Sequence, residues 1–282
     1  MRSGTMRLPR LRADRVATYS LLGIFAIVSG YPLLWVVFGS FKTNGELFTN
    51  IWLWPNRPVL DNYASAWNVV GIGAGTVNSL IVTASCVVLV VVIGSVTGYT
   101  LARRSIPGKR LLLAVILLTM VIRPSFAAVQ LFEVVRSLGI LNTYLALVLP
   151  YTATSLPLAI ALFTSFFLAI PVELEEAARI DGASTLTVFR RIVMPLSTPV
   201  LSAVVIFTFL DAYNELFMAL ILLSDPKLRT LPPTLAGIIG QYDKSYPQLF
   251  AGLAASTLPV LVVFLAFRRR FISGVMSGAV RG

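Results

Sequence analysis

The chain consists of long apolar runs separated by short stretches that hold its charges and its turn-forming residues. A bilayer core about 30 Å thick requires roughly 20 apolar residues in a helix. Six runs reach this length, and they predict six membrane-spanning helices. In chain order they are 16–38, 76–102, 111–130, 144–169, 200–223 and 249–267. The pattern predicts an all-α integral membrane protein.

Composition supports this prediction and excludes several functions. Apolar residues make up 57% of the 282 positions and charged residues only 12%, too few to cover a soluble protein of this size. The net charge of +11 does not indicate nucleic-acid binding, because the chain lacks the polar surface for a solvated basic face. With no histidine and one cysteine, Cys86, the sequence excludes histidine acid–base chemistry, disulfides within the chain and the usual Cys/His zinc sites.

The lysines and arginines set the expected orientation. In a six-helix chain, four segments share one side of the membrane. The N-terminal tail holds five lysines and arginines, the 103–110 loop four, the 170–199 loop three and the C-terminal tail four. That makes sixteen, against six on the other side and Arg123 within a span. Basic loops stay in the cytoplasm, so both termini are predicted there. The first run is long for a signal peptide and no cleavage site follows it, so it is interpreted as a retained helix.

The resulting domain organisation is simple. Residues 1–15 form a cytoplasmic basic tail, 16–267 a six-helix transmembrane domain, and 268–282 a cytoplasmic C-terminal tail. Residues 170–199, between the fourth and fifth helices, form a cytoplasmic loop longer than a turn requires.

This long loop has the local signals of a helix–turn–helix. Pro171 can start a helix, and the acidic residues after it suit the positive end of a helix dipole. Glu175 and Arg179 are spaced as an i, i+4 ion pair. Gly182 can adopt the left-handed conformation that ends a helix, and Ser184 can cap the next one, which runs to Pro195.

The loop also carries a spaced motif. It has Glu-Ala-Ala at 176–178, then three residues, glycine at 182, nine residues, isoleucine at 192, one residue, and Met-Pro at 194–195. This spacing resembles the EAA loop of binding-protein-dependent ABC importer permeases, with Met194 in place of leucine. Ile170-Pro171 and the run 180–183 resemble the carbohydrate-uptake branch, as do Asn78-Ser79 and the run 213–215. The ending 277–282 is similar to that of maltose-type second permeases.

The resemblance implies that the loop contains a coupling helix that docks on a separate ATPase subunit. Glu176 would make a polar contact, Gly182 would provide the turn, and the alanines would form a close-fitting surface. The coupling set carried over from the motif is Glu176, Ala177, Ala178, Asp181, Gly182, Ala183, Ile192 and Pro195. The resemblance also implies that a C-terminal tail reaches the ATPase: Gly278, Ala279, Val280, Arg281 and Gly282.

Polar residues inside the spans are candidates for the translocation path, because charges are costly in a bilayer. Asp211, Asn214 and Glu215 are spaced to share one face of the fifth span, and Arg123 precedes a proline in the third. We expect these four residues and Asn78 to lie along the path. The alternatives are a structural pair between Arg123 and an acid, or an Arg123 that extends to the membrane surface.

The sequence therefore predicts a non-enzymatic permease subunit that imports a sugar or sugar derivative across a bacterial or archaeal plasma membrane. The resemblance implies a second permease, two ATPase subunits and an external solute-binding protein as partners. It places ATP and Mg²⁺ in the ATPase, and no cofactor or nucleic acid on this chain. The alternatives are an ATPase-independent secondary transporter or channel, a permease for glycerol-phosphate-type substrates, and an intramembrane enzyme with acidic metal sites.

Overall fold

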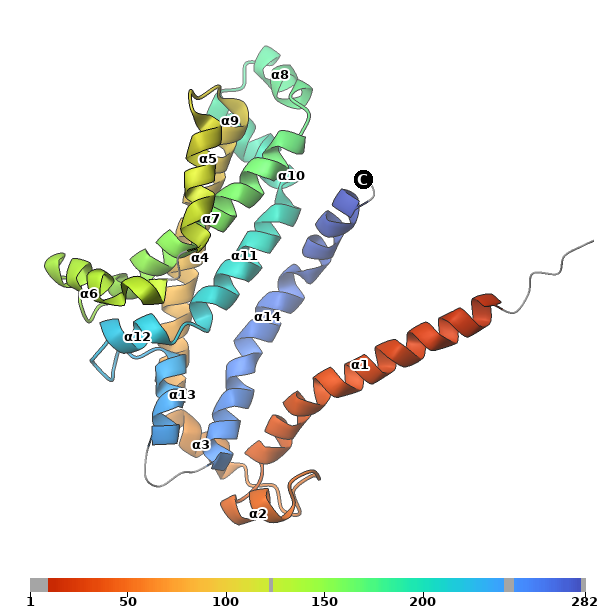
Figure 1. The fold of residues 1–282 in the computed structure, drawn as a ribbon, viewed down its shortest axis with the longest axis vertical. Helices are drawn as coiled ribbons and strands as arrows, with labels where there is room; N and C mark the ends of the chain where they lie inside the picture. Colours follow the sequence, from red (N-terminus) through yellow and green to blue (C-terminus); the bar gives the residue numbers. More distant parts are fainter. Residues whose placement is uncertain (1–9, 122–123, 241–245, 280–282) are drawn as a thin grey trace, which may run out of the picture. The chain divides into compact units, whose positions relative to one another are not determined.

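The computed structural model describes residues 10–121, 124–240 and 246–279, and each regular element in these ranges is a helix (Figure 1). The all-α prediction is confirmed. The chain forms two compact units. One comprises residues 1–69 and 241–255, and the other residues 70–240 and 256–282.

The first unit contains α1 (Arg10–Ser40), α2 (Asn44–Thr49), α3 (Asp61–Asn68) and the first residues of α14 (Tyr246–Ala279). Aromatic rings join its segments: Trp35 packs edge-on against Phe250, with ring centroids 5.0 Å apart. The loop after α1 encloses Lys42, whose ammonium donates to the carbonyl oxygens of Asn50 and Ile51. Burial lowers the pKa of this ammonium, because the charged form loses hydration.

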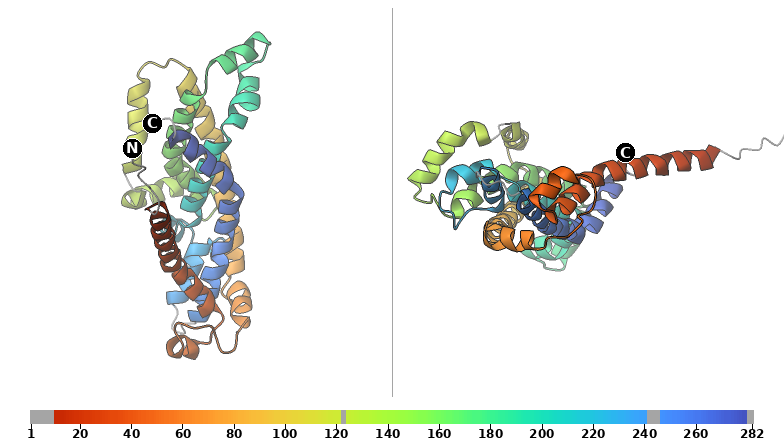
Figure 2. Two further views of the ribbon diagram at one scale, coloured as in Figure 1. Left: turned by 90° about the vertical axis from the view of Figure 1, so that its right-hand side faces the viewer. Right: turned by 90° about the horizontal axis from the view of Figure 1, so that it is seen from below.

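The second unit holds most of the helices. Its long helices are α4 (Ile72–Arg103), α7 (Leu145–Ala169) and α11 (Thr198–Tyr213), which run alongside one another (Figures 1 and 2). Its shorter helices are α5 (Lys109–Leu118), α6 (Ala128–Ser137), α8 (Glu173–Ile180), α9 (Thr185–Val188), α10 (Met194–Leu196), α12 (Phe217–Leu222) and α13 (Leu231–Gly240). Within this unit, α8 lies at one end of α4 and α13 at the other (Figure 1).

Two glycines let α4 and α7 approach closely. A Cβ atom on Gly98 would lie 2.7 Å from the Cβ of Phe163, and one on Gly94 would lie 3.1 Å from the Cβ of Ala159. Small residues spaced four apart permit such backbone contact in membranes. Gly94 and Gly98 form a Gly-x-x-x-Gly pattern in the second predicted span, and this pattern serves helix packing.

Four helices are long and apolar enough to cross a membrane in the described part of the chain: α1, α4, α7 and α14. They coincide with the first, second, fourth and sixth predicted spans. The third and fifth predicted spans differ from the structure, because neither is one continuous helix. Residues 111–130 are divided between α5, short 3₁₀ turns and α6, and residues 200–223 between α11 and α12.

Both interruptions have local causes. Pro124 has no amide hydrogen to donate within a helix, and a 3₁₀ turn begins at this residue. In the fifth span, Asn214 bonds back to the Leu210 carbonyl and ends α11. The Glu215 carboxylate then accepts from the amides of Met218 and Ala219 and so caps the start of α12. In both segments the run of apolar residues continues across the break, but the helical backbone is interrupted there.

Candidate functional site

The helix–turn–helix expected in the long loop is present as α8, a turn and α9. Acidic residues occupy the first turn of α8, and Gly182 closes the helix with φ +83°. The amide of Ala183 donates to the carbonyl of Ala178, and the amide of Gly182 to that of Arg179, a Schellman closure. The Ser184 hydroxyl accepts from the amide of Thr187 and caps α9.

A buried carboxylate fixes α8 to the end of α4. Glu175 is 1% exposed and accepts from the Tyr99 hydroxyl and from Nε of Arg103, each at 2.6 Å. The Arg103 guanidinium also donates to the Ile170 carbonyl at 2.9 Å, at the end of α7. Arg179, one turn along α8, lies 3.8 Å from the same carboxylate and forms the expected i, i+4 pair.

The coupling residues implied by the motif divide into two groups. Exposed positions include Glu176, Ala177, Asp181 and Gly182 on α8 and its turn, and Pro195 further along. Half-buried positions are Ala178, Ala183 and Ile192, of which Ala178 and Ala183 pack against the hydrophobic core.

The exposed part of this helix is also apolar. Ile180 is 86% exposed and Leu186, at the start of the next helix, 64%. The exposed motif residues on α8 and its turn thus lie beside exposed apolar side chains. We call this set the α8 face: residues 176–177 and 180–182, with Leu186, which combine small and apolar residues with the carboxylates of Glu176 and Asp181.

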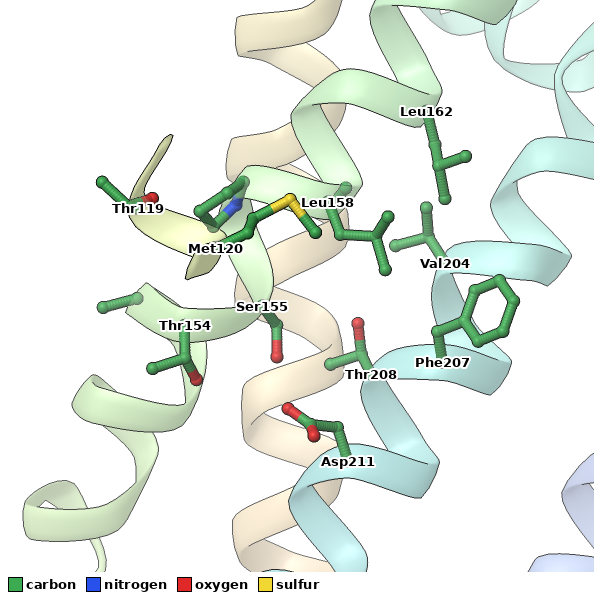
Figure 3. A pocket seen from close by; sticks show the side chains of 13 residues that line it. Thr119, Met120, Thr154, Ser155, Leu158, Leu162, Val204, Phe207, Thr208 and Asp211 are labelled. Carbon is green, nitrogen blue, oxygen red and sulfur yellow. The ribbon is translucent and has the colours of Figure 1, made fainter. Parts of the chain in front are cut away.

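Elsewhere in the same unit, α7 and α11 border a partly open cavity of about 480 Å³, whose lining includes exposed residues such as Phe207 and Asp211 (Figure 3). Its polar lining includes Ser155 from α7 and Thr208 and Asp211 from α11, whose side-chain oxygens point toward the same space (Figure 3). Ser155 is 9% exposed, and its hydroxyl has no hydrogen-bond partner among the described residues. Apolar side chains complete the walls: Met120, Leu158, Leu162, Val204 and Phe207.

The three polar residues predicted to share one face of the fifth span have separate environments. Asp211 lines the cavity. Asn214 bonds to its own helix, and Glu215 accepts from the Tyr151 hydroxyl at 2.7 Å as well as capping α12. The helix ends at Tyr213, so the i, i+3, i+4 face does not continue through residues 214 and 215.

Asn78 lies in a hydrogen-bond network between segments. Its amide nitrogen donates to the carbonyls of Lys227 and Arg229, and its amide oxygen accepts from the Tyr144 hydroxyl. It is 6% exposed. These contacts hold the start of α4 against the segment before α13, and a role for Asn78 along the path stays a prediction.

Two groups of predicted residues fall where the structure gives no description. Arg123 lies outside the described residues. The helix α14 continues through Gly278 to Ala279, while Val280, Arg281 and Gly282 lie outside the described ranges. Among the residues with a described placement, no group of three or more acidic or cysteine side chains could hold a metal ion.

Sequence reasoning missed four residues that the structure brings into these sites: Tyr99, Arg103, Ser155 and Thr208. Tyr99 and Arg103 are four apart, which places both on one side of α4 near its end, and that spacing was a usable signal. Thr208 and Asp211 are three apart on α11 in the same way. Ser155 gave no signal, since a lone serine in an apolar span usually bonds to its own helix.

Comparison with known proteins gives consistent matches along most of the chain. Residues 90–276 match the family described as binding-protein-dependent transport system inner membrane component. The probable ABC transporter permease protein YurM of Bacillus subtilis is 38% identical over 266 residues, which cover 94% of this chain and 88% of the relative.

Several relatives carry names that mention sugars, and two of them illustrate the match. The diacetylchitobiose uptake system permease protein NgcG of Streptomyces coelicolor is 35% identical, covering 94% of this chain and 88% of its own length. The trehalose transport system permease protein SugB of Mycobacterium tuberculosis is 36% identical, covering 95% and 99%. A solved bacterial ABC transporter for the acidic polysaccharide alginate aligns with a TM-score of 0.81 at 23% identity, covering 95% of this chain and 100% of that chain. At that identity the match shows a shared fold.

Proposed function

The chain belongs to the family of binding-protein-dependent ABC importer permeases, in its carbohydrate-uptake branch, and from this premise we propose how it works as a sugar permease. In this proposal a sugar crosses the membrane into the cytoplasm through this subunit and a second permease. The chain itself performs no hydrolysis, and ATP with Mg²⁺ binds in two partner ATPase subunits. An external solute-binding protein delivers the sugar. The membrane is the plasma membrane of a bacterium or archaeon.

The observation that carries the proposal is an exposed docking face on a firmly held helix. The α8 face presents small and apolar side chains and two carboxylates to solvent, while the buried Glu175 ties the same helix to Arg103 and Tyr99. A face of this kind suits a groove in a partner, because small residues allow close approach and the anchor keeps the helix from tilting freely. An unpartnered apolar helix face also marks an interaction site.

The proposed coupling site is therefore the loop 170–199, acting as the coupling helix on the ATPase. Glu176 makes the polar contact and Gly182 provides the turn. The remaining proposed members are Ala177, Ala178, Asp181, Ala183, Ile192 and Pro195. The C-terminal residues 278–282 are proposed as a second ATPase contact.

Six crossings remain our proposal for the membrane topology. The helices α1, α4, α7 and α14 provide four, and the broken segments 111–130 and 200–223 provide the other two, with both termini in the cytoplasm. Interrupted helices are tolerated at membrane depth where they are buried in protein or line a cavity. The break that follows Tyr213 lies close to Asp211, which lines the cavity, and this agrees with the condition.

A sugar is favoured over other solutes by the saccharides in the relatives' names. An ATPase-independent transporter or channel is disfavoured, since it would have no use for an exposed coupling loop. We assign Arg123, Asp211, Asn214, Glu215 and Asn78 to the translocation path as candidates.

The test is to purify the chain with its ATPase and measure ATP hydrolysis stimulated by the sugar-loaded binding protein. Ala177→Arg would place a long charged side chain on the α8 face. We expect it to lose co-purified ATPase and sugar uptake, while the chain still inserts into the membrane. Ala64→Arg makes the same change at an exposed alanine on α3 and should keep both. Normal ATPase binding and uptake in Ala177→Arg would overturn the coupling assignment.

A further inference from the structure

We infer that the cavity between α7 and α11 binds a neutral saccharide, and that Asp211 selects against acidic sugars. The inference rests on the proposed function and extends it, because it names a substrate class and a residue that determines it. The volume of the cavity, about 480 Å³, falls in the range of roughly 300–1,000 Å³ typical of small-molecule sites.

The polar groups of the cavity match the hydrogen-bonding pattern of a sugar. The Ser155 hydroxyl is buried and unpartnered, although a buried polar group without a partner is costly. A bound hydroxyl group could both donate to it and accept from it. Thr208 offers a second hydroxyl on the facing helix, and the Asp211 carboxylate can accept from two neighbouring hydroxyls at once.

The backbone of α7 adds an acceptor in the same place. Pro157 has no amide hydrogen, so it cannot donate to the carbonyl of Ala153, the residue four positions earlier. Both residues line the cavity. A carbonyl without its regular helical donor is available to a ligand hydroxyl, which is how interrupted helices often serve polar substrates inside membranes.

The charge that the described residues give the cavity disfavours acidic sugars. Asp211 is the one ionisable side chain that lines it among the described residues, which do not include Arg123, and no described basic side chain joins it there. In a cavity of this size a ligand carboxylate, sulfonate or phosphate would lie within several ångströms of Asp211, where like charges repel strongly. Neutral sugars escape this repulsion, whereas glycerol-phosphate-type substrates do not.

The apolar walls suit the remaining surface of a sugar ring. Leu158 and Leu162 come from α7, and Val204 and Phe207 from α11. Small-molecule sites commonly combine apolar walls with a few convergent polar groups. Here those walls would contact the C–H faces of a ring while Ser155, Thr208 and Asp211 bond its hydroxyls.

A reporter cysteine can test the cavity without relying on transport. The chain has one cysteine, so Cys86→Ser gives a cysteine-free background, and Ala153→Cys then places a thiol at an exposed position that lines the cavity. The complete transporter is treated with cationic aminoethyl methanethiosulfonate or anionic sulfonatoethyl methanethiosulfonate. Labelling is repeated with trehalose, melibiose, diacetylchitobiose or a uronic-acid disaccharide present.

We expect the cationic reagent to react about tenfold faster than the anionic one, relative to their rates with a free thiol. Asp211→Asn should remove most of this preference, while Asp225→Asn, which lies outside the cavity, should retain it. At least one of the neutral disaccharides should slow labelling, and the uronic-acid disaccharide should not. Asp211→Asn should also admit the acidic disaccharide.

Three results would overturn the inference: equal rates for the two reagents, a preference unchanged in Asp211→Asn, or protection by the acidic disaccharide but by none of the neutral ones. The last result would mean that the cavity admits acidic sugars and that the neutral sugars bind elsewhere. Sugar uptake by the unmodified transporter is measured in parallel. If the labelling is as expected but the transporter takes up no sugar, the proposed function alone is contradicted. If sugar uptake is normal but the expected labelling pattern is absent, this inference alone is contradicted.

Discussion

The Nε atom of Arg103 donates to Oε1 of Glu175 at 2.6 Å and joins the last turn of α4 to the first turns of α8. The two side chains are 10% and 1% exposed, so the pair is shielded from water. Tyr99 and Arg179 occupy the other carboxylate oxygen. Each oxygen of this buried carboxylate therefore has a partner, as a carboxylate removed from water requires.

Replacing Glu175 by alanine should therefore destabilise the protein. It would leave the Arg103 guanidinium partly buried without its counter-ion, a change that costs about 3 kcal/mol in comparable sites. The measurement is thermal unfolding of the purified chain in detergent, with uptake measured in cells. Glu173→Ala, at an exposed position of the same helix, should change stability by less than about 0.5 kcal/mol. Equal effects in the two variants would contradict a special role for the buried pair.

Gly182 should tolerate only residues that accept a positive φ. Nothing lies within 4 Å of a Cβ built on it, so its φ of +83° is the sole restriction. Gly182→Asn should retain sugar uptake, because asparagine enters the left-handed region readily. Gly182→Val should distort the turn and reduce uptake strongly while membrane insertion continues. Unchanged uptake in the valine variant would count against the coupling assignment.

Gly98 should be sensitive to a single added methyl group. Its Cβ would meet the Cβ of Phe163 at 2.7 Å, so Gly98→Ala would force α4 and α7 apart at a cost of about 1–3 kcal/mol. Gly94→Ala, with a nearest contact of 3.1 Å, should be milder. Gly23→Ala in α1 has open space around it and serves as the control in thermal unfolding. A stability order that places Gly23→Ala below Gly98→Ala would refute the close-packing interpretation.

Charge reversal separates two roles for Glu215. Its carboxylate is already engaged by the Tyr151 hydroxyl and by the amides at the start of α12. We therefore expect Arg123→Glu and Glu215→Arg each to lower uptake, and the double variant to remain impaired. Uptake assays of the three variants decide the matter. Recovery in the double variant alone would instead demonstrate a structural ion pair between the two residues.

Much of the architecture could be predicted from hydrophobic length and turn chemistry. Four long helices, the Gly94/Gly98 packing and the turn at Gly182 all follow from short-range patterns that act within a few residues. The interruption at Asn214 could not be predicted in this way, because its apolar flanks satisfy the hydrophobic criterion whether or not the backbone is continuous. There, side chains compete with the helix for its own backbone groups.

The contacts that join distant segments were not predictable either. Arg103 was counted among the basic residues that set orientation, and its pairing with Glu175 depends on how the end of α4 meets α8. The cavity likewise depends on the relative rotation of α7 and α11, which decides whether Ser155 faces Thr208 or the bilayer. Periodicity within one helix does not determine these rotations.

The close approach at Gly94 and Gly98 has a mechanical consequence. Two helices whose backbones touch cannot slide past each other without a clash, so α4 and α7 behave as one stiff rod. The helix α8 is attached to this rod twice, by the chain at Ile170 and by Arg103. A force applied to α8 would therefore act on both helices of this rod together.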